Sequence, residues 1–178
     1  MGDIQIHDKS FEPYLTAESI QQRVAALGKT LSHDYEGRSP IVLCILNGSF
    51  IFTADLVRAM HLPVRIEFVR YSSYSGTSST GQITQIMGLK SDLKDEHVII
   101  VEDIIDTGFT IASALRDLQK SNPASVKVVS LLLKPDALRH EVPTDYIGFE
   151  IPNDFVVGYG LDYDELGRDL PAIYRLKG

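Results

Sequence analysis

Apolar residues recur along this chain with helical spacing in some stretches and in unbroken runs in others. Ile20, Val24, Leu27 and Leu31 are separated by four, three and four positions, which predicts a helix that Thr16 could cap. Mainly apolar runs are typical of strands buried on both faces. They cover residues 41–46 and 98–101 without interruption, and residues 126–133, where Lys127 and Ser130 are the only polar members. Further patterns predict a helix over 50–60, an alternating strand over 64–68, and a strand, turn and helix over 97–121. Short apolar segments follow over 146–151 and 155–159.

Strands that alternate with helices predict an α/β fold, with a parallel sheet covered by helices on both faces. We find no internal repeat and no second domain, so residues 1–178 are expected to form a single domain. Ligands bind such sheets beyond the carboxyl ends of the strands. Asn47-Gly48, the segment 103–110 and Lys134 each follow a predicted strand. Three separate segments should therefore meet at one edge of the sheet.

Residues 98–110 carry the most informative pattern in the chain. A β-branched run ends in the adjacent carboxylates Glu102 and Asp103, and two apolar residues then lead into Asp106-Thr107-Gly108-Phe109-Thr110. A tight turn from strand to helix offers backbone N–H groups and the positive end of a helix, which favour a phosphate group. Carboxylates beside a phosphate would repel it, so they imply a divalent cation or a ribose diol between them.

Length and charge narrow the class of function. A chain of 178 residues with 44% hydrophobic residues can bury a sizeable core. The formal net charge of −7 argues against a nucleic-acid partner. No apolar segment reaches the ~18 residues that span a membrane, and residues 1–10 are too polar for a signal peptide. We therefore expect a cytoplasmic protein, and the single cysteine, Cys44, lies in an apolar run that suggests an inert core thiol.

Several other patterns are absent or leave two interpretations open. The glycine motifs of ATPases and dinucleotide-binding proteins do not occur, and the five histidines lack metal-ligand spacing. Lys134 ends an apolar strand before Pro135, where its ammonium group faces either a ligand or solvent. The aromatic run 155–163 could stack on a purine or belong to the core. The polar segment 72–81 is either a disordered surface loop or a lid.

The order and spacing of these pieces resemble the hypoxanthine-guanine phosphoribosyltransferases over about residues 41–169. The matching pieces are Leu46-Asn47-Gly48, Ser73-Tyr74, residues 102–108, Lys134, residues 155–159 and 161–163, and Arg168-Asp169. The resemblance implies the type I phosphoribosyltransferase fold, in which a central, mainly parallel sheet is flanked by helices and carries a small hood. It also implies a flexible active-site loop over 72–82, with Ser73 and Tyr74 in the lid, and a cis peptide bond between Leu46 and Asn47.

This resemblance also implies an activity and a role for each matching residue. The activity is transfer of 5-phosphoribosyl from 5-phosphoribosyl 1-diphosphate to N9 of a 6-oxopurine, which gives IMP or GMP and pyrophosphate in purine salvage. Asp106 takes the place of the proposed general base. Phosphoribosyl diphosphate is expected to bind Leu46, Asn47, Gly48, Glu102, Asp103, Asp106, Thr107, Gly108, Phe109, Thr110 and Arg168. The purine is expected to bind Ile104, Lys134, Phe155, Val156, Leu161 and Asp162.

The expected cofactor is Mg²⁺, with Glu102 and Asp103 as ligands and Asp162 as the ligand of a second ion. The expected assembly is a homodimer or homotetramer. One residue departs from the family pattern, because many relatives have Lys or Arg where this chain has Asn47. Two alternative functions remain open from the sequence. The first is an enzyme that prefers xanthine, and the second is a non-catalytic regulator that senses phosphoribosyl diphosphate.

Overall fold

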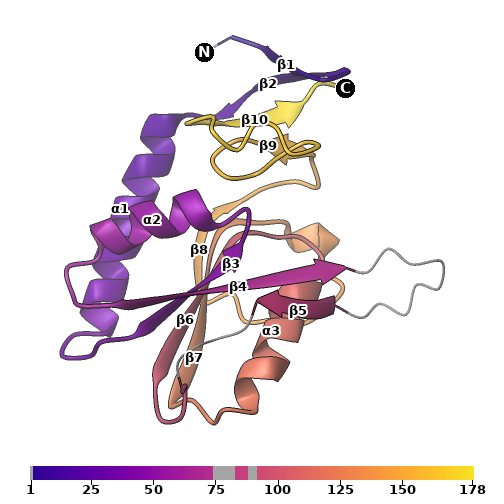
Figure 1. The fold of residues 1–178 in the computed structure, drawn as a ribbon. Helices are drawn as coiled ribbons and strands as arrows, with labels where there is room; N and C mark the ends of the chain where they lie inside the picture. The colour runs from indigo at the N-terminus through magenta and orange to yellow at the C-terminus, as the bar shows by residue number, and fades with distance from the viewer. Residues whose placement is uncertain (1, 74–82, 88–91) are drawn as a thin grey trace.

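The computed structural model describes residues 2–73, 83–87 and 92–178, and its helices and strands are drawn in Figure 1. The helices are α1 (Ala17–Asp34), α2 (Phe50–Ala59) and α3 (Phe109–Gln119), with a short 3-10 turn over Pro135–Ala137. The strands are β1 (Ile4–Ile6), β2 (Lys9–Leu15), β3 (Ile41–Leu46), β4 (Arg65–Ser73), β5 (Ile83–Met87), β6 (His97–Ile105), β7 (Ser125–Leu133), β8 (Tyr146–Glu150), β9 (Val156–Val157) and β10 (Ile173–Leu176).

The larger sheet has the strand order β5-β4-β3-β6-β7-β8. Neighbouring strands pair in parallel among β4, β3, β6, β7 and β8. Only β5, at the edge beside β4, runs antiparallel. The connections from β3 to β4 and from β6 to β7 pass through α2 and α3, as parallel pairing requires. The predicted α/β class with a mainly parallel sheet is therefore confirmed.

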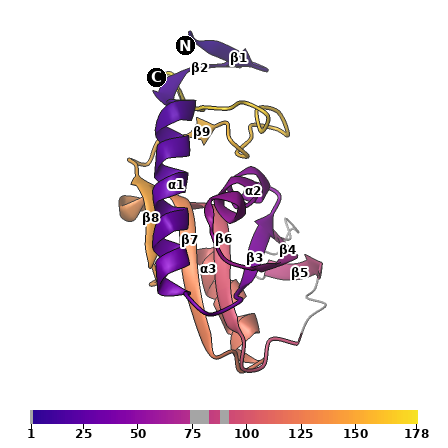
Figure 2. The ribbon, with the colours of Figure 1, turned by 90° about the vertical axis from the view of Figure 1, so that its left-hand side faces the viewer.

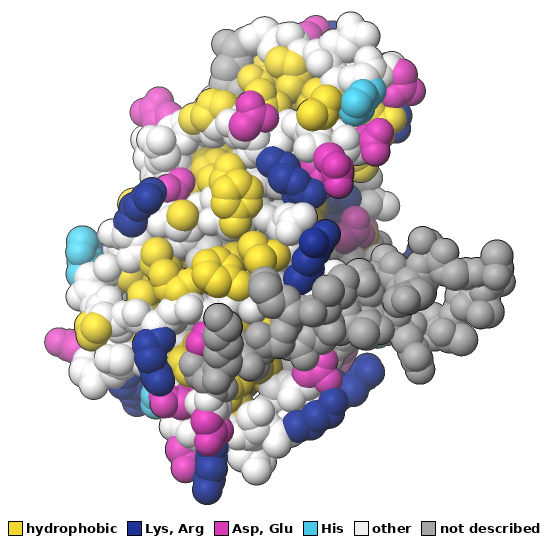
Figure 3. Space-filling model, viewed as in Figure 1, with side chains coloured by type: hydrophobic (Ala, Val, Ile, Leu, Met, Phe, Trp, Pro, Cys, Tyr) yellow, Lys and Arg dark blue, Asp and Glu magenta, His cyan; other side chains and the backbone are white. Residues whose placement is uncertain are grey.

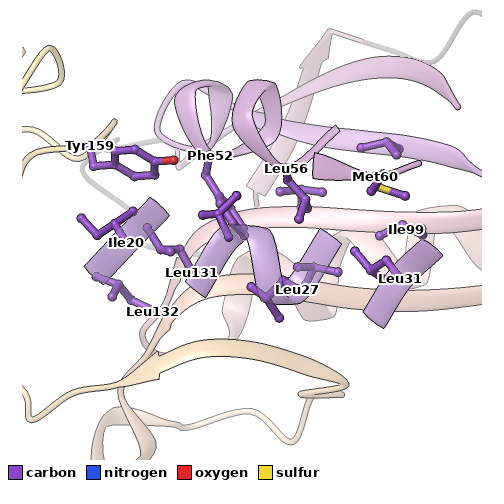
Figure 4. Packing of buried hydrophobic residues seen from close by; sticks show 14 of the residues in the cluster. Ile20, Leu27, Leu31, Phe52, Leu56, Met60, Ile99, Leu131, Leu132 and Tyr159 are labelled. Carbon is purple, nitrogen blue, oxygen red and sulfur yellow. The ribbon is translucent and has the colours of Figure 1, made fainter. Parts of the chain in front are cut away.

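Helices cover both faces of this sheet, and the central strands are buried between them. α1 and α2 pack together on one face through Leu27, Leu31, Phe52, Leu56 and Met60, as Figure 4 shows. α3 packs its buried residues, Ile111, Ala114 and Leu118, on the opposite face. The α1 stripe predicted from spacing is buried, and Thr16 Oγ1 accepts from the Ser19 N–H at 3.1 Å as its cap. Cys44 is fully buried in β3, as predicted.

A second, smaller sheet lies beyond one end of the larger one and forms the hood (Figures 1 and 2). Its strand order is β1-β2-β10-β9, so both ends of the chain meet in it. Phe11, Val157 and Ala172 are the most deeply buried members of its core. The apolar patterns did not predict β1, β2 or β10, because these strands are short and β2 is interrupted by Pro13.

β4 contains the alternating strand predicted over 64–68, but the expectation that its apolar face would be buried is wrong. Ile66 is 43% exposed and Phe68 is 44% exposed, and Phe50 at the start of α2 is 44% exposed. Figure 3 shows hydrophobic side chains exposed on the middle part of the molecule, below the hood.

Along the described part of the chain, no helix is both long and apolar enough to cross a membrane.

Candidate active site

The carboxyl ends of β3, β6 and β7 meet at the edge of the sheet that faces the hood, as predicted from the sequence. Leu46 ends β3 and is joined to Asn47 by a cis peptide bond, which was also predicted. Lys134 follows β7, and its backbone N–H donates to the Ile105 carbonyl at the end of β6, at 2.9 Å. This hydrogen bond holds the ends of the two central strands side by side.

A pocket of about 260 Å³ opens at this edge and is lined by residues 102–111. Its floor is the turn from β6 into α3, where Gly108 has φ +80°, in the left-handed region that favours glycine. The first helical hydrogen bond runs from the Ala112 N–H to the Gly108 carbonyl at 3.0 Å. The N–H groups of Thr110 and Ile111 therefore precede the helical ladder and are available to an anion.

The same turn is anchored from outside by the segment that follows the 3-10 turn. The backbone N–H groups of Arg139 and His140 donate to the Thr107 carbonyl at 3.0 and 3.1 Å. The His140 ring also lies 5.2 Å from the Phe109 ring. Phe109 thus packs its ring against His140, and its backbone N–H donates to Thr107 Oγ1 at 3.4 Å.

Glu102 and Asp103 form a buried carboxylate pair at the mouth of the pocket, each only 8% exposed. Asp103 Oδ1 accepts from the Ile104 N–H at 2.9 Å, whereas Glu102 Oε2 has no hydrogen-bond partner among the described residues. Burial, reinforced by the neighbouring Asp103 charge, holds the pKa of Glu102 well above its usual range. Burial also raises the pKa of Asp103. A divalent cation would compensate both charges, and oxygen ligands of this kind suit Mg²⁺.

Replacing Glu102 by Gln should stabilise the metal-free protein by about 1–3 kcal/mol near neutral pH, because an amide avoids burying an unpaired charge. The folded-state pKa of Glu102 lies above its unfolded-state value, so this side chain costs stability as pH rises through the folded value. The advantage of Glu102→Gln should therefore grow between about pH 5 and about pH 8. Urea unfolding at both pH values measures it. An advantage that shrinks with rising pH would contradict the expectation.

Gly48 packs directly against the carboxylate pair. A Cβ at this position would lie 1.6 Å from Asp103 Oδ2, so only glycine allows the loop after β3 to approach so closely. A Cβ at Gly160 in the hood would lie 2.0 Å from the Gly48 carbonyl oxygen. The loop after β3 is thus held between the end of β6 and the hood. Asn47 beside it is exposed.

Lys134 and Asp106 directly follow β7 and β6, and their side chains form an ion pair between the ends of these two strands. Lys134 Nζ donates to Asp106 Oδ2 at 3.0 Å. The lysine side chain is 8% exposed and the aspartate side chain 47% exposed, so a buried ammonium reaches a carboxylate that solvent or a ligand can contact. The open question of whether Lys134 is solvated is answered, because it is buried and paired at the site.

An aromatic cluster lies in the hood. The Phe155 ring, 43% exposed, stands at 85° to the Tyr163 ring with 5.8 Å between their centroids. Lys9 Nζ lies 4.4 Å from the Tyr163 ring centroid and 5.5 Å from that of Phe155. Phe11 packs on both rings at 6.2 Å. Phe155 is therefore an accessible aromatic face on a rigid support, while Val156 and Leu161 nearby in sequence are buried.

Asp162 and Arg168 pair in the same part of the hood. Arg168 Nη2 lies 2.8 Å from Asp162 Oδ1, and Arg168 Nη1 donates to the Gly160 carbonyl at 2.8 Å. Burial raises the pKa of Asp103, and the positive charge of Arg168 opposes this increase slightly, so Arg168 acts on the carboxylate pair. Asp162 Oδ2 accepts from the Glu165 N–H at 2.8 Å.

The structure thus brings together Asn47–Gly48, residues 102–110 and Lys134, with the hood residues 155–168 above them. Asp162 does not join Glu102 and Asp103 in one cluster, since no three His, Cys, Asp or Glu side chains among the described residues are arranged to hold a metal. The lid prediction concerns residues 72–82, of which 74–82, including Tyr74, lie outside the described residues, and the side chain of Ser73 is not described either. Sequence patterns missed the support from Lys9 and Phe11, because these residues precede Phe155 by more than a hundred positions.

Comparison with known proteins decides which family has this arrangement. A model of the phosphoribosyl transferase domain matches residues 11–164. The hypoxanthine-guanine phosphoribosyltransferase of Mycobacterium bovis is 46% identical over 166 residues, which are 89% of this chain and 82% of that protein. The chain belongs to the hypoxanthine-guanine phosphoribosyltransferase family.

Other members of this family are similar to this chain in sequence or structure over nearly its whole length. The hypoxanthine-guanine phosphoribosyltransferase of Dictyostelium discoideum is 43% identical over 173 residues, which cover 94% of this chain and 96% of that protein. A crystal structure of a hypoxanthine phosphoribosyltransferase from Staphylococcus aureus superposes with a TM-score of 0.89 at 42% identity. The superposed residues cover 93% of this chain and 91% of the Staphylococcus aureus chain. The type I phosphoribosyltransferase fold that the sequence resembles is thereby confirmed.

Proposed function

We infer that this chain transfers the 5-phosphoribosyl group from 5-phosphoribosyl 1-diphosphate to N9 of a 6-oxopurine, hypoxanthine or guanine. The products are IMP or GMP and pyrophosphate, so the enzyme is a transferase of purine salvage. Besides membership of the family, one observation supports this most strongly. A buried lysine and an accessible carboxylate, Lys134 and Asp106, lie 3.0 Å apart beside a turn built for a phosphate.

We propose that the turn after β6 binds the 5′-phosphate. The backbone N–H groups of Gly108, Phe109, Thr110 and Ile111 and the hydroxyls of Thr107 and Thr110 supply donors, and the start of α3 supplies the positive end of a helix. The Phe109 N–H would exchange its hydrogen bond to Thr107 Oγ1 for one to the phosphate. The chain carries a net negative charge, but such local donors can reverse the field within one site. This assignment leaves Glu102 and Asp103, at the other end of the pocket, to face the ribose.

Mg²⁺ is the proposed cofactor, and Glu102 and Asp103 are its proposed protein ligands. Their oxygens are buried and under-compensated, as a site for a cation requires. Two carboxylates with water and substrate oxygens form a usual Mg²⁺ environment. When bound, the ion would neutralise charge on the diphosphate and so make pyrophosphate a better leaving group. Asp162 is proposed to serve a second ion, which would require it to part from Arg168.

Pyrophosphate leaves from C1′ of the ribose, and we propose that the loop after β3 and Arg168 receive it. In the loop formed by Leu46, Asn47 and Gly48, Gly48 lies against Asp103, and Gly160 connects this loop to Arg168. Arg168 supplies positive charge where the leaving group gains negative charge. Asn47 cannot supply the charge that Lys or Arg provides in many relatives, so Arg168 carries more of this role here.

Asp106 and Lys134 are proposed to act on the purine. As the bond from N9 to C1′ forms and the bond from C1′ to pyrophosphate breaks, Asp106 accepts the proton that leaves N7. Lys134 donates a hydrogen bond to O6. An oxo group accepts this hydrogen bond, whereas the exocyclic amine of adenine cannot. Separation of the present ion pair by the incoming base would let each residue take up its own role.

The hood is proposed to hold the flat face of the base. Phe155 offers an exposed ring for stacking, and Val156, Leu161 and Ile104 would surround the edges of the purine. Water would intercept the positive charge that develops on ribose, so a lid over residues 72–82, with Ser73 and Tyr74, remains part of the proposal. We also propose that residues 1–178 act as one domain, in the cytoplasm, with no nucleic-acid or membrane partner.

A homodimer or homotetramer remains a prediction of the sequence resemblance. Phe50, Ile66 and Phe68 are large apolar side chains exposed on α2 and β4, and a second copy of the chain is the partner we propose for them. Light scattering of the purified protein measures the assembly. A monomer at all concentrations would contradict this proposal.

The proposed function is tested by offering hypoxanthine, guanine, xanthine and adenine separately, with phosphoribosyl diphosphate and Mg²⁺. We expect monophosphate from hypoxanthine or guanine and none from adenine, followed by absorbance and chromatography. Product from xanthine alone would instead favour the xanthine-preferring enzyme. Binding of phosphoribosyl diphosphate without any product would favour the regulator.

A further inference from the structure

A hydrogen bond joins the hood to the helix that follows the loop after β3. The Tyr159 hydroxyl donates to Asp55 Oδ2 on α2 at 2.7 Å, across 104 positions of sequence. Figure 4 shows the Tyr159 ring beside Phe52, with its hydroxyl directed toward α2. Tyr159 is 4% exposed, and burial together with the Asp55 carboxylate raises the pKa of its hydroxyl. The hydroxyl therefore stays protonated and remains a donor to Asp55.

The backbone around Tyr159 is left-handed over three consecutive residues. Gly158 has φ +106°, Tyr159 has φ +50° and Gly160 has φ +104°. For a tyrosine this conformation costs roughly 1–2 kcal/mol, so the surrounding contacts must hold it in place. The Tyr159 N–H donates to the Leu170 carbonyl at 2.8 Å, and the side chain is held by Asp55. Tyr159 is thus fixed at both its backbone and its hydroxyl.

The segment of residues 158–160 contacts the loop that precedes α2. Gly160 approaches the Gly48 carbonyl so closely that a Cβ would lie 2.0 Å from it. Asp55 lies seven positions after Gly48, on the helix that begins at Phe50. The hydrogen bond from Tyr159 holds the hood segment to α2, and the contact at Gly160 holds the same segment to the loop before α2. Together they fix how the hood segment sits against this loop and helix.

The same segment also sets the place of Arg168. The Gly160 N–H donates to the Arg168 carbonyl at 2.9 Å, and Arg168 Nη1 donates back to the Gly160 carbonyl at 2.8 Å. Gly160 is thus the common contact of Gly48 and Arg168. Any movement of Gly160 changes the spacing between the backbone after β3 and the guanidinium group.

We propose that Tyr159 and Asp55 are positioning residues that set this spacing for the pyrophosphate group of the donor. The inference rests on the proposed function, which assigns the backbone at 46–48 and Arg168 to pyrophosphate. Neither Tyr159 nor Asp55 touches the substrate in this account. The Tyr159 ring supplies core packing, and its hydroxyl supplies the alignment, so removing the hydroxyl alone separates the two contributions.

The test compares Tyr159→Phe with Tyr146→Phe. Tyr146 donates to Asp34 Oδ2 at 2.8 Å, between β8 and α1, so the control removes the same kind of hydrogen bond from another part of the molecule. Tyr159→Phe should raise the KM for phosphoribosyl diphosphate by roughly 3–30-fold, which is less than the full effect of a lost hydrogen bond to a charged group because neither Tyr159 nor Asp55 touches the substrate. The KM for hypoxanthine should change less than twofold, and Tyr146→Phe should leave both values within twofold.

Asp55→Asn gives a second measurement of the same contact. Asparagine keeps an acceptor oxygen for the Tyr159 hydroxyl, so its KM for phosphoribosyl diphosphate should lie between those of wild type and Asp55→Ala. The double variant Tyr159→Phe/Asp55→Ala should be no worse than Asp55→Ala alone, because both changes break one hydrogen bond. Equal effects of Asn and Ala, or additive effects in the double variant, would overturn the proposed link.

Calorimetry with inorganic pyrophosphate and Mg²⁺ keeps this inference separate from the proposed function. We expect Tyr159→Phe to weaken pyrophosphate binding and Tyr146→Phe to leave it unchanged. Unchanged binding for Tyr159→Phe, or a rise in both KM values by the same factor, would overturn the positioning role. A wild-type protein that binds pyrophosphate but makes no nucleotide would overturn the proposed function, and the binding comparison would still test the role of Tyr159.

Discussion

Replacing Asp106 by Asn should lower kcat for IMP formation by ~10²–10⁴-fold, the range that a positioned general base contributes. Asparagine has nearly the same shape and can still accept from Lys134, but its amide cannot take a proton from N7. The KM for phosphoribosyl diphosphate should change little. Steady-state kinetics with each substrate varied in turn measures both quantities.

Asp117→Asn is the matched control for this variant. Asp117 Oδ1 pairs with Lys120 Nζ at 2.7 Å at the C-terminal end of α3, so the control also neutralises the acid of an Asp–Lys pair. Its kcat should stay within twofold of wild type. A kcat for Asp106→Asn that also stays near the wild-type value would remove Asp106 from the role of general base.

Replacing Lys134 by Met should lower kcat/KM for hypoxanthine and guanine by roughly 10–200-fold. This range corresponds to the about 1.5–3 kcal/mol of a hydrogen bond from a charged donor. The lysine side chain is 8% exposed and its ammonium group is directed at Asp106, so the hydrogen bond that it donates is shielded from water. Binding of phosphoribosyl diphosphate should be unchanged, because the residues proposed to hold it lie on the turn after β6 and the loop after β3.

The preference for hypoxanthine over adenine is the most specific measurement of the effect of Lys134→Met. The ratio of kcat/KM for hypoxanthine to that for adenine should fall in Lys134→Met, because the donor that selects an oxo group is lost. Lys120→Met removes the lysine of the exposed pair on α3 and serves as the control. If Lys134→Met uses hypoxanthine as well as wild type does, the proposed contact with O6 is wrong.

The parts of the site that lie on single segments could be predicted from the sequence. The run from Val98 to Thr110 contains a strand, a carboxylate pair, a turn and a helix start, and each of these is determined by neighbouring residues. The position of Lys134 at the end of β7 was predicted for the same reason. Its burial and its ion pair with Asp106 were not, because they depend on how β6 and β7 lie side by side.

The hood shows where such prediction fails. Lys9 and Phe11 support Phe155 through the pairing of β2 with β10, which joins opposite ends of the chain. The hydrogen bond from Tyr159 to Asp55 likewise spans 104 positions. No periodicity links residues so far apart. The two glycines around Tyr159 were a local signal of an unusual backbone, but they did not indicate what it would contact.

Magnesium-dependent formation of IMP tests the central claim most directly. Purified protein is mixed with hypoxanthine and phosphoribosyl diphosphate, and IMP and pyrophosphate are quantified together, in Mg²⁺, in excess EDTA, and after Mg²⁺ is restored. The account predicts equal amounts of IMP and pyrophosphate, no product in EDTA, and full recovery with Mg²⁺. Full activity in excess EDTA would contradict the metal role of Glu102 and Asp103, and pyrophosphate release without IMP would contradict transfer to the purine.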